Sequence, residues 1–188
     1  MDIDIRNTKQ LIELARYLVS TAGSKISLNK LAKVFGISKD TISTYIGYMI
    51  DAYLLFEVTY FSYSAKVRHD LSKLPKLYVL DNGLIHVASI KYSENLGQKF
   101  ENTVLIKLEE QFDEISYWSE LKSEVDFIVD RLAINVTAND KMSKREMQGL
   151  ENFQKANKTF YTLLITNSIS KDNMTSLREF LLKYQIEN

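Results

Sequence analysis

Apolar residues recur at helical spacing in three segments near the start of the chain, at 8–20, 31–35 and 42–49. Each segment has one apolar stripe and one polar side, which predicts three amphipathic helices. Ser27 and Ser38 precede the second and third helices and are expected to cap them, while Gly36 stands in the short turn between them. A helix, a glycine-containing turn and a second helix are typical of a helix-turn-helix unit.

Two further apolar runs, 53–58 and 77–80, flank a polar segment at 59–76 that is rich in Ser, Lys and Tyr. They predict two strands joined by a loop, which after a third helix is the wing of a winged helix. If this unit binds DNA, its third helix enters the major groove and the cations of the loop contact phosphates. The residues expected to contact DNA are Lys39, Ser43, Thr44 and Tyr48 on the third helix and Lys66, Arg68 and Lys73 on the loop.

The second half of the chain alternates between the two periodicities. It predicts, in order, a helix at 97–112, strands at 115–118, 124–129 and 132–137, a helix opened by a Ser143–Glu146 capping box, a buried strand at 159–165 and a closing helix. The chain is therefore expected to be a mixed α/β protein with two domains, a winged helix-turn-helix at 1–92 and an α-β-β-β-α-β domain at 93–188. Tyr60, Phe61 and Tyr63 are expected to pack against the second domain, and stacking on nucleic-acid bases is the alternative.

Composition narrows the classes of protein that remain. The chain has 188 residues, of which 45% are hydrophobic and 26% charged, and it has no Cys, which excludes disulfides and thiolate metal sites. No apolar run reaches membrane-spanning length and no signal peptide is recognisable, so a cytoplasmic protein without a membrane partner is expected. Residues 1–93 hold 12 Lys and Arg against 8 Asp and Glu, whereas residues 94–188 hold 12 against 16, which indicates different partners for the two halves.

Two carboxylates of the second half stand where a magnesium-dependent nuclease holds its metal. Glu101 lies on the first helix of this half and Asp126 on its second strand. A Mg²⁺ ion held by such oxygen ligands activates a water and stabilises charge on a phosphodiester. The third strand of such a site carries an acid, any residue and a lysine, but here it holds Asn135, Val136 and Thr137. Residues that could replace the missing groups are Glu124, Lys141, Lys144 and Glu151.

The motifs together resemble the C-terminal region of prokaryotic, largely archaeal and bacterial, AAA-type P-loop ATPases. They are DIR at 4–6, SKDTISTYI at 38–46, KLYVLDNGL at 76–84, GQKFEN at 97–102, ISYW at 115–118 and EVDFI at 124–128. The resemblance implies a winged helix followed by a domain of the PD-(D/E)xK restriction-endonuclease-like fold, and an ATPase domain as a partner in cis or in trans. The family's usual Glu-Val-Lys on the third strand is absent here, and no G-x-x-x-x-G-K-[ST] phosphate-binding loop occurs in the chain.

Three functions are compatible with these patterns. The leading hypothesis is a non-catalytic DNA-binding or interaction module, with no cofactor and double-stranded DNA as a partner. The first alternative is a Mg²⁺- or Mn²⁺-dependent DNase that uses Glu101, Asp126 and Glu124 with a relocated base. The second alternative is a scaffold that binds only proteins, because winged helices also serve in protein–protein contacts.

Overall fold

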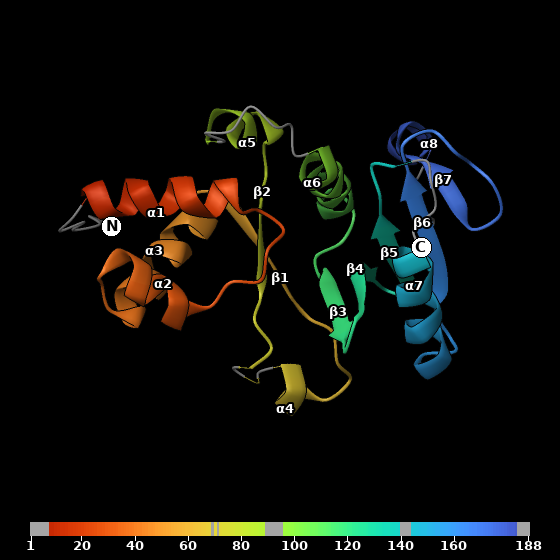
Figure 1. Cartoon of the computed structure of the whole chain (residues 1–188), viewed down its shortest axis with the longest axis horizontal. Helices are drawn as coiled ribbons and strands as arrows, with labels where there is room; N and C mark the ends of the chain where they lie inside the picture. Colours follow the sequence, from red (N-terminus) through yellow and green to blue (C-terminus); the bar gives the residue numbers. More distant parts are fainter. Residues whose placement is uncertain (1–7, 69, 71, 89–95, 140–143, 184–188) are drawn as a thin grey trace. The chain divides into compact units, whose positions relative to one another are not determined.

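The computed structural model describes residues 8–68, 70, 72–88, 96–139 and 144–183, and within them the chain is a mixed α/β protein (Figure 1). Lys141, Ser143 and the segment at 4–6 lie outside these residues. The helices are α1 (Thr8–Ser20), α2 (Leu28–Phe35), α3 (Lys39–Asp51), α4 (Ala65–Arg68), α5 (Asn82–Ala88), α6 (Leu96–Glu109), α7 (Lys144–Ala156) and α8 (Leu177–Lys183). The strands are β1 (Leu55–Tyr60), β2 (Lys76–Val79), β3 (Ser116–Glu120), β4 (Ser123–Val129), β5 (Leu132–Val136), β6 (Tyr161–Thr166) and β7 (Met174–Ser176).

The described residues form two compact units. Unit 1 comprises those within Met1–Glu57 and Leu74–Ser93, and unit 2 comprises those within Val58–Lys73 and Glu94–Asn188. The strands follow the order β2-β1-β3-β4-β5-β6-β7, with both parallel and antiparallel pairs. The chain passes from unit 1 to unit 2 within β1.

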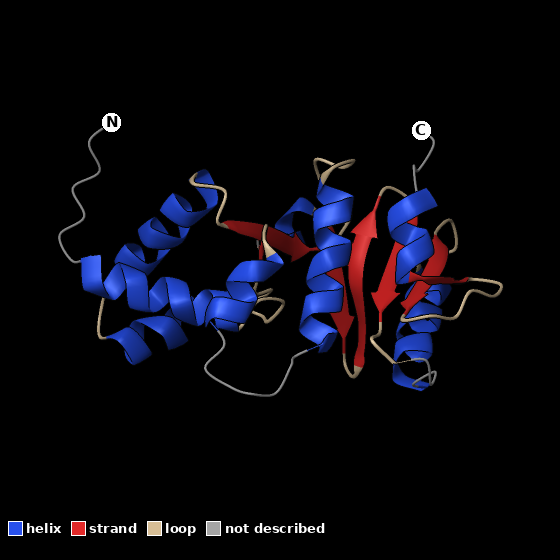
Figure 2. Ribbon diagram, turned by 90° about the horizontal axis from the view of Figure 1, so that it is seen from above, coloured by secondary structure: helices blue, strands red, loops and turns tan. Residues whose placement is uncertain are grey.

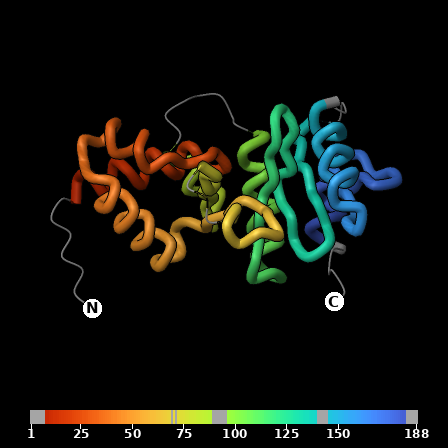
Figure 3. The backbone as a smooth tube through the Cα atoms, turned by 90° about the horizontal axis from the view of Figure 1, so that it is seen from below, coloured from red at the N-terminus to blue at the C-terminus, as the bar shows by residue number. Residues whose placement is uncertain are grey.

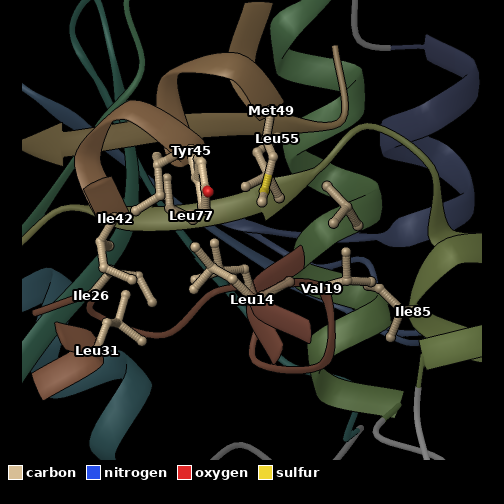
Figure 4. Close-up of a cluster of buried hydrophobic side chains, with 14 residues drawn as sticks. Leu14, Val19, Ile26, Leu31, Ile42, Tyr45, Met49, Leu55, Leu77 and Ile85 are labelled. Carbon is tan, nitrogen blue, oxygen red and sulfur yellow. The ribbon is translucent and has the colours of Figure 1, made fainter. Parts of the chain in front are cut away.

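Unit 1 is built on the three helices that the apolar spacing predicts. Ser27 accepts a hydrogen bond from the amide of Lys30, and Ser38 accepts one from the amide of Thr41, so both predicted N-caps are confirmed. Gly36 ends α2 in the left-handed conformation with a φ of 65°, which glycine adopts without a steric penalty. The buried side chains of the three helices meet β1, β2 and α5 in one core (Figure 4), which includes Leu14, Leu18, Leu31, Ile42, Tyr45, Leu55, Leu77 and Ile85.

The strands of unit 1 differ from the prediction at their ends. Tyr53 has a φ of 55°, a left-handed conformation outside the β region, and β1 begins at Leu55 and not at Tyr53. The polar segment that follows was expected to be a loop, but it contains the short helix α4. In addition, this segment belongs to unit 2 from Val58 to Lys73.

Unit 2 is a sheet with helices on both faces. Strands β3, β4 and β5 are antiparallel neighbours, while β6 runs parallel to β5 and β7 parallel to β6. Helix α7 packs against β4, β5 and β6 on one face, while α6 and α8 lie on the other (Figures 2 and 3). The predicted order of elements is present with one addition, β7, whose three residues are too few to produce a recognisable alternation.

An aromatic cluster joins the 58–73 segment to the rest of unit 2. The ring centre of Phe61 lies 5.7 Å from that of Phe153 and 5.6 Å from that of Phe160. The ring centres of Trp118 and Phe153 are 5.5 Å apart. Tyr60 contacts the ring of Tyr117 on β3 in the same edge-to-face manner. The expected packing against the second half of the chain is therefore confirmed for Tyr60 and Phe61, whereas Tyr63 is 73% exposed.

Candidate functional site

A β-bulge lies at the position of Asp126 on β4. Ser116 of β3 is paired with Ile128 of β4, but Trp118 is paired with Val125, so one residue of β3 faces two of β4. The two are Asp126 and Phe127, and such a bulge bends the strand and re-aims its side chains. The backbone pairs between β4 and β5 end at Phe127 and Ile134. Beyond that point β4 stays paired with β3, and β5 with β6.

Side chains take over where the backbone pairing between β4 and β5 ends. The Oδ2 atom of Asp126 accepts a hydrogen bond of 2.9 Å from the backbone amide of Val136. In the other direction, the backbone amide of Asp126 donates to Oδ1 of Asn135 at 3.0 Å. The carboxylate and the amide thus act as substitutes for the backbone carbonyls that an uninterrupted ladder would supply.

The side chain of Asn135 also ties the two strands to α7. Its Nδ2 atom donates to the backbone carbonyls of Glu124 at 3.2 Å and of Glu146 at 2.8 Å. These partners fix the orientation of the amide, because carbonyls can only accept and the amide of Asp126 can only donate. Asn135 is 2% exposed, and both of its donors are bound to the backbone.

Helix α7 approaches β4 closely at the same place. A Cβ atom on Gly149 would lie 2.3 Å from the carbonyl oxygen of Glu124 and 3.2 Å from Nδ2 of Asn135. Only glycine allows this approach. One turn further along α7, Nδ2 of Asn152 donates to Oγ of Ser123 at 2.8 Å. These contacts therefore join the bulged strand β4, strand β5 and helix α7.

This geometry determines what chemistry the site offers. A carboxylate at position 135 could accept from the amide of Asp126 but could not donate to the two carbonyls, so the asparagine is required by the packing. Thr137 is buried, and its Oγ1 accepts a hydrogen bond from the amide of Asn139. Glu101 and Glu124 are half-buried, and Glu151 is exposed. Across the described ranges, no three His, Asp or Glu side chains converge as a metal site requires.

The residues expected to contact DNA are divided between the two units. Lys39, Ser43 and Thr44 are exposed on α3 in unit 1. Tyr48 is half-buried and packs against the core of unit 1, so only part of its side chain is open to solvent. Its position three residues after the buried Tyr45 puts it on the same side of the helix.

Lys66, Arg68 and Lys73 lie in unit 2. Lys66 and Arg68 are exposed on α4, and Nζ of Lys73 lies 4.2 Å from the centre of the Tyr60 ring. Between them, the carboxylate of Asp70 accepts a hydrogen bond from the backbone amide of Ser72. That hydrogen bond lowers the pKa of the Asp70 carboxyl from its ordinary value.

The structure adds two cations that the sequence reasoning missed. Lys30 and Lys33 are exposed on α2, the helix that precedes α3. The signal was present in the sequence, because no Asp or Glu occurs between Glu13 and Asp40, while Arg16, Lys25, Lys30, Lys33 and Lys39 all fall there.

Comparisons with known proteins place the chain in a family whose function is not known. The family described as "Domain of unknown function (DUF8612)" matches residues 3–104, and the chain belongs to it. The match includes helices α1 to α5, strands β1 and β2, and the first part of α6.

A curated relative shares the sequence more broadly. The chain is 29% identical over 161 residues to "Uncharacterized protein MJ1544" of Methanocaldococcus jannaschii, a match that covers 78% of this chain and 35% of the relative. The chain thus spans about a third of the length of that relative. No solved structure matches the chain. Within the described residues, no helix combines the length and the apolar character needed to cross a membrane.

Proposed function

We propose that the chain is a non-catalytic DNA-binding module, in which unit 1 acts as a winged helix-turn-helix on duplex DNA. Helix α3 enters the major groove, and α2 crosses the sugar–phosphate backbone, as in other helix-turn-helix proteins. Ser43 and Thr44 then face base edges, while Lys39 lies near the groove at the beginning of α3.

The observation that carries this proposal is the charge of the exposed surface of α2 and of the start of α3. Lys30, Lys33 and Lys39 are exposed there, and Asp40 is the acidic residue beside them. Exposed lysines on these two helices can neutralise phosphates, which supplies most of the affinity of non-specific DNA binding. Phosphate contacts also fix the register from which α3 reads bases.

The order of elements in unit 2 supports a restriction-endonuclease-like fold that has lost its chemistry. Asp126 lies on the second strand of that arrangement, but the position of the next acid is held by Asn135. Because both donors of Asn135 bind backbone carbonyls, this residue is committed to the packing of α7 and not to a metal ion. The domain then serves a structural or docking role.

An AAA-type ATPase is the partner that the sequence motifs suggest, in cis or in trans. This part of the proposal rests on the resemblance of the motifs along the chain. The winged helix would contact DNA beside such a motor, and unit 2 would provide a surface for docking.

Fluorescence anisotropy with a labelled duplex over a salt series tests the DNA contact. The expected result is binding at low salt that weakens as salt rises, with a log–log slope of about −0.9 for each neutralised phosphate. The double variant Lys30→Ala, Lys33→Ala should make that slope shallower by about 1.8. Lys158→Ala removes an exposed lysine of unit 2 and is the matched control. Absence of binding at low salt, or a slope that is unchanged in the double variant, would contradict the proposal.

A cleavage assay tests whether the protein lacks nuclease activity, as the proposal states. Supercoiled plasmid incubated with the protein and Mg²⁺ or Mn²⁺ should remain intact. Cleavage that is lost in Asp126→Ala would instead establish the DNase alternative.

A further inference from the structure

The segment Val58–Lys73 of unit 2 is firmly anchored at its beginning. The backbone amide of Phe61 donates to the carbonyl of Tyr117 at 2.7 Å, and its ring lies in the aromatic cluster with Phe153 and Phe160. After Phe61 the chain enters α4, whose first turn is closed by hydrogen bonds from Val67 and Arg68 to the carbonyl of Ser64. Residues 62–68 therefore lie between the anchored Phe61 and the end of α4.

Among Tyr60, Phe61 and Tyr63, the ring of Tyr63 is the most exposed. Its ring packs edge-to-face with that of Phe61, with 5.2 Å between the two ring centres, yet the residue is 73% exposed. Burial of so little of a ring contributes little to folding. An exposed ring offers a surface on which a nucleobase can stack.

Three cations lie in the same segment of the sequence as this ring. Lys66 and Arg68 are exposed within a single helix of about 6 Å in length, α4. Lys73 is the last residue of the segment, and its Nζ atom lies above the ring of Tyr60. Asp70 is the one carboxylate described in the segment and stays ionised, so three cations, Lys66, Arg68 and Lys73, stand against one anion.

We propose that Tyr63, Lys66, Arg68 and Lys73 form a binding surface for single-stranded nucleic acid. The ring of Tyr63 stacks on a base, and the three cations contact the phosphates on either side. A single strand fits better than a duplex, because the faces of paired bases are covered by their neighbours and only an unpaired base presents its face to a ring.

This surface is separate from the duplex contact proposed for unit 1. It shares no residue with α2 or α3, and it requires neither a metal ion nor a working nuclease site. Failure of one contact therefore leaves the other intact, and variants in each unit distinguish them.

Anisotropy of a labelled oligothymidylate of about 15 nucleotides, a length that such surfaces cover, tests the inference with the full chain. Tyr63→Ala should weaken binding about fivefold or more, the loss typical of one stacked base. Tyr63→Phe keeps the ring and should bind as the wild type does. Tyr161→Ala removes an equally exposed tyrosine of unit 2, 75% exposed, and should leave binding unchanged.

The charge contribution has its own readout. Lys66→Ala with Arg68→Ala should make the log–log salt slope shallower by about 1.4, because each phosphate of a single strand contributes about 0.7. Lys30→Ala with Lys33→Ala should weaken duplex binding and leave the oligothymidylate affinity unchanged. The inference is overturned if the wild type does not bind oligothymidylate at low salt. It is equally overturned if Tyr63→Ala binds as Tyr161→Ala does.

Discussion

Asp126 and Asn135 exchange side-chain and backbone hydrogen bonds across the point where β4 and β5 separate. Oδ1 of Asn135 accepts from the amide of Asp126, and Oδ2 of Asp126 accepts from the amide of Val136, the residue after Asn135. Asn135 therefore joins β4 to β5 at the position where the proposed nuclease-like fold would carry an acid. A carboxylate at this position could not donate the two hydrogen bonds that Asn135 makes to backbone carbonyls.

Replacing Asn135 with aspartate should destabilise unit 2. Asn135→Asp keeps the shape of the side chain but removes the donors to the carbonyls of Glu124 and Glu146. Losing these two hydrogen bonds costs roughly 1–3 kcal/mol of the free energy of unfolding. Urea unfolding followed by Trp118 fluorescence measures the loss. Asn139→Asp makes the same chemical change at an exposed position, and an equal effect of both variants would contradict the account.

Gly149 should resist substitution although it lies inside a helix. Gly149→Ala places a Cβ atom 2.3 Å from the carbonyl oxygen of Glu124, so α7 has to move away from β4, at a cost of about 1–3 kcal/mol. Gly47 is also in the interior of a helix, but no atom lies within 4 Å of its added Cβ. Gly47→Ala should therefore stabilise the protein by roughly 0.5–1 kcal/mol. Thermal or urea unfolding of the two variants should give shifts of opposite sign, and shifts of the same sign would show that α7 does not approach β4 so closely.

Two serines of the proposed helix-turn-helix unit should separate stability from DNA binding. Ser38 caps α3 through the amide of Thr41 at 3.1 Å, so Ser38→Ala should lower the free energy of unfolding by about 1 kcal/mol. Ser43 is exposed on α3, so Ser43→Ala should change stability by less than about 0.5 kcal/mol while weakening duplex binding. Urea unfolding and duplex anisotropy on both variants provide the comparison. If Ser43→Ala binds duplex DNA as the wild type does, α3 does not enter the groove by the face that carries Ser43.

Phe61 should control the order of the segment that carries Tyr63 and the α4 cations. Phe61→Ala removes the contacts with Phe153 and Phe160, so the amides of Val67 and Arg68 should exchange faster with solvent. Hydrogen exchange detects this locally. Tyr161→Ala removes an exposed ring of the same unit and should leave that protection unchanged. Unaltered exchange in Phe61→Ala would mean that the aromatic cluster does not anchor the segment.

The parts that the sequence predicted well depend on local interactions. The caps at Ser27 and Ser38 and the turn at Gly36 involve neighbours within a few residues, and the apolar spacing that defines α1 and α3 is periodic. The beginning of the first strand was predicted at Tyr53 and lies at Leu55, because the pattern of apolar residues does not reveal the left-handed conformation of Tyr53.

The candidate site depends on contacts that the sequence cannot display. Asp126 was recognised on its strand, but its bulge arises from the pairing with β3, whose Trp118 is opposite Val125. The bond from Asn135 to the carbonyl of Glu146 joins residues 11 positions apart on a strand and a helix. From the sequence, Asn135 could be described only by what it is not. The structure supplies its partners and hence the reason for an amide at that position.

The most direct test of the central claim is a gel-shift experiment on an end-labelled duplex with the protein in Mg²⁺, in which each sample is run on native and denaturing gels. The account predicts a shifted band on the native gel and a full-length strand on the denaturing gel, with the shift weakened in Lys30→Ala, Lys33→Ala. An unshifted duplex at low salt, or strands shortened by the wild type but not by Asp126→Ala, would contradict it.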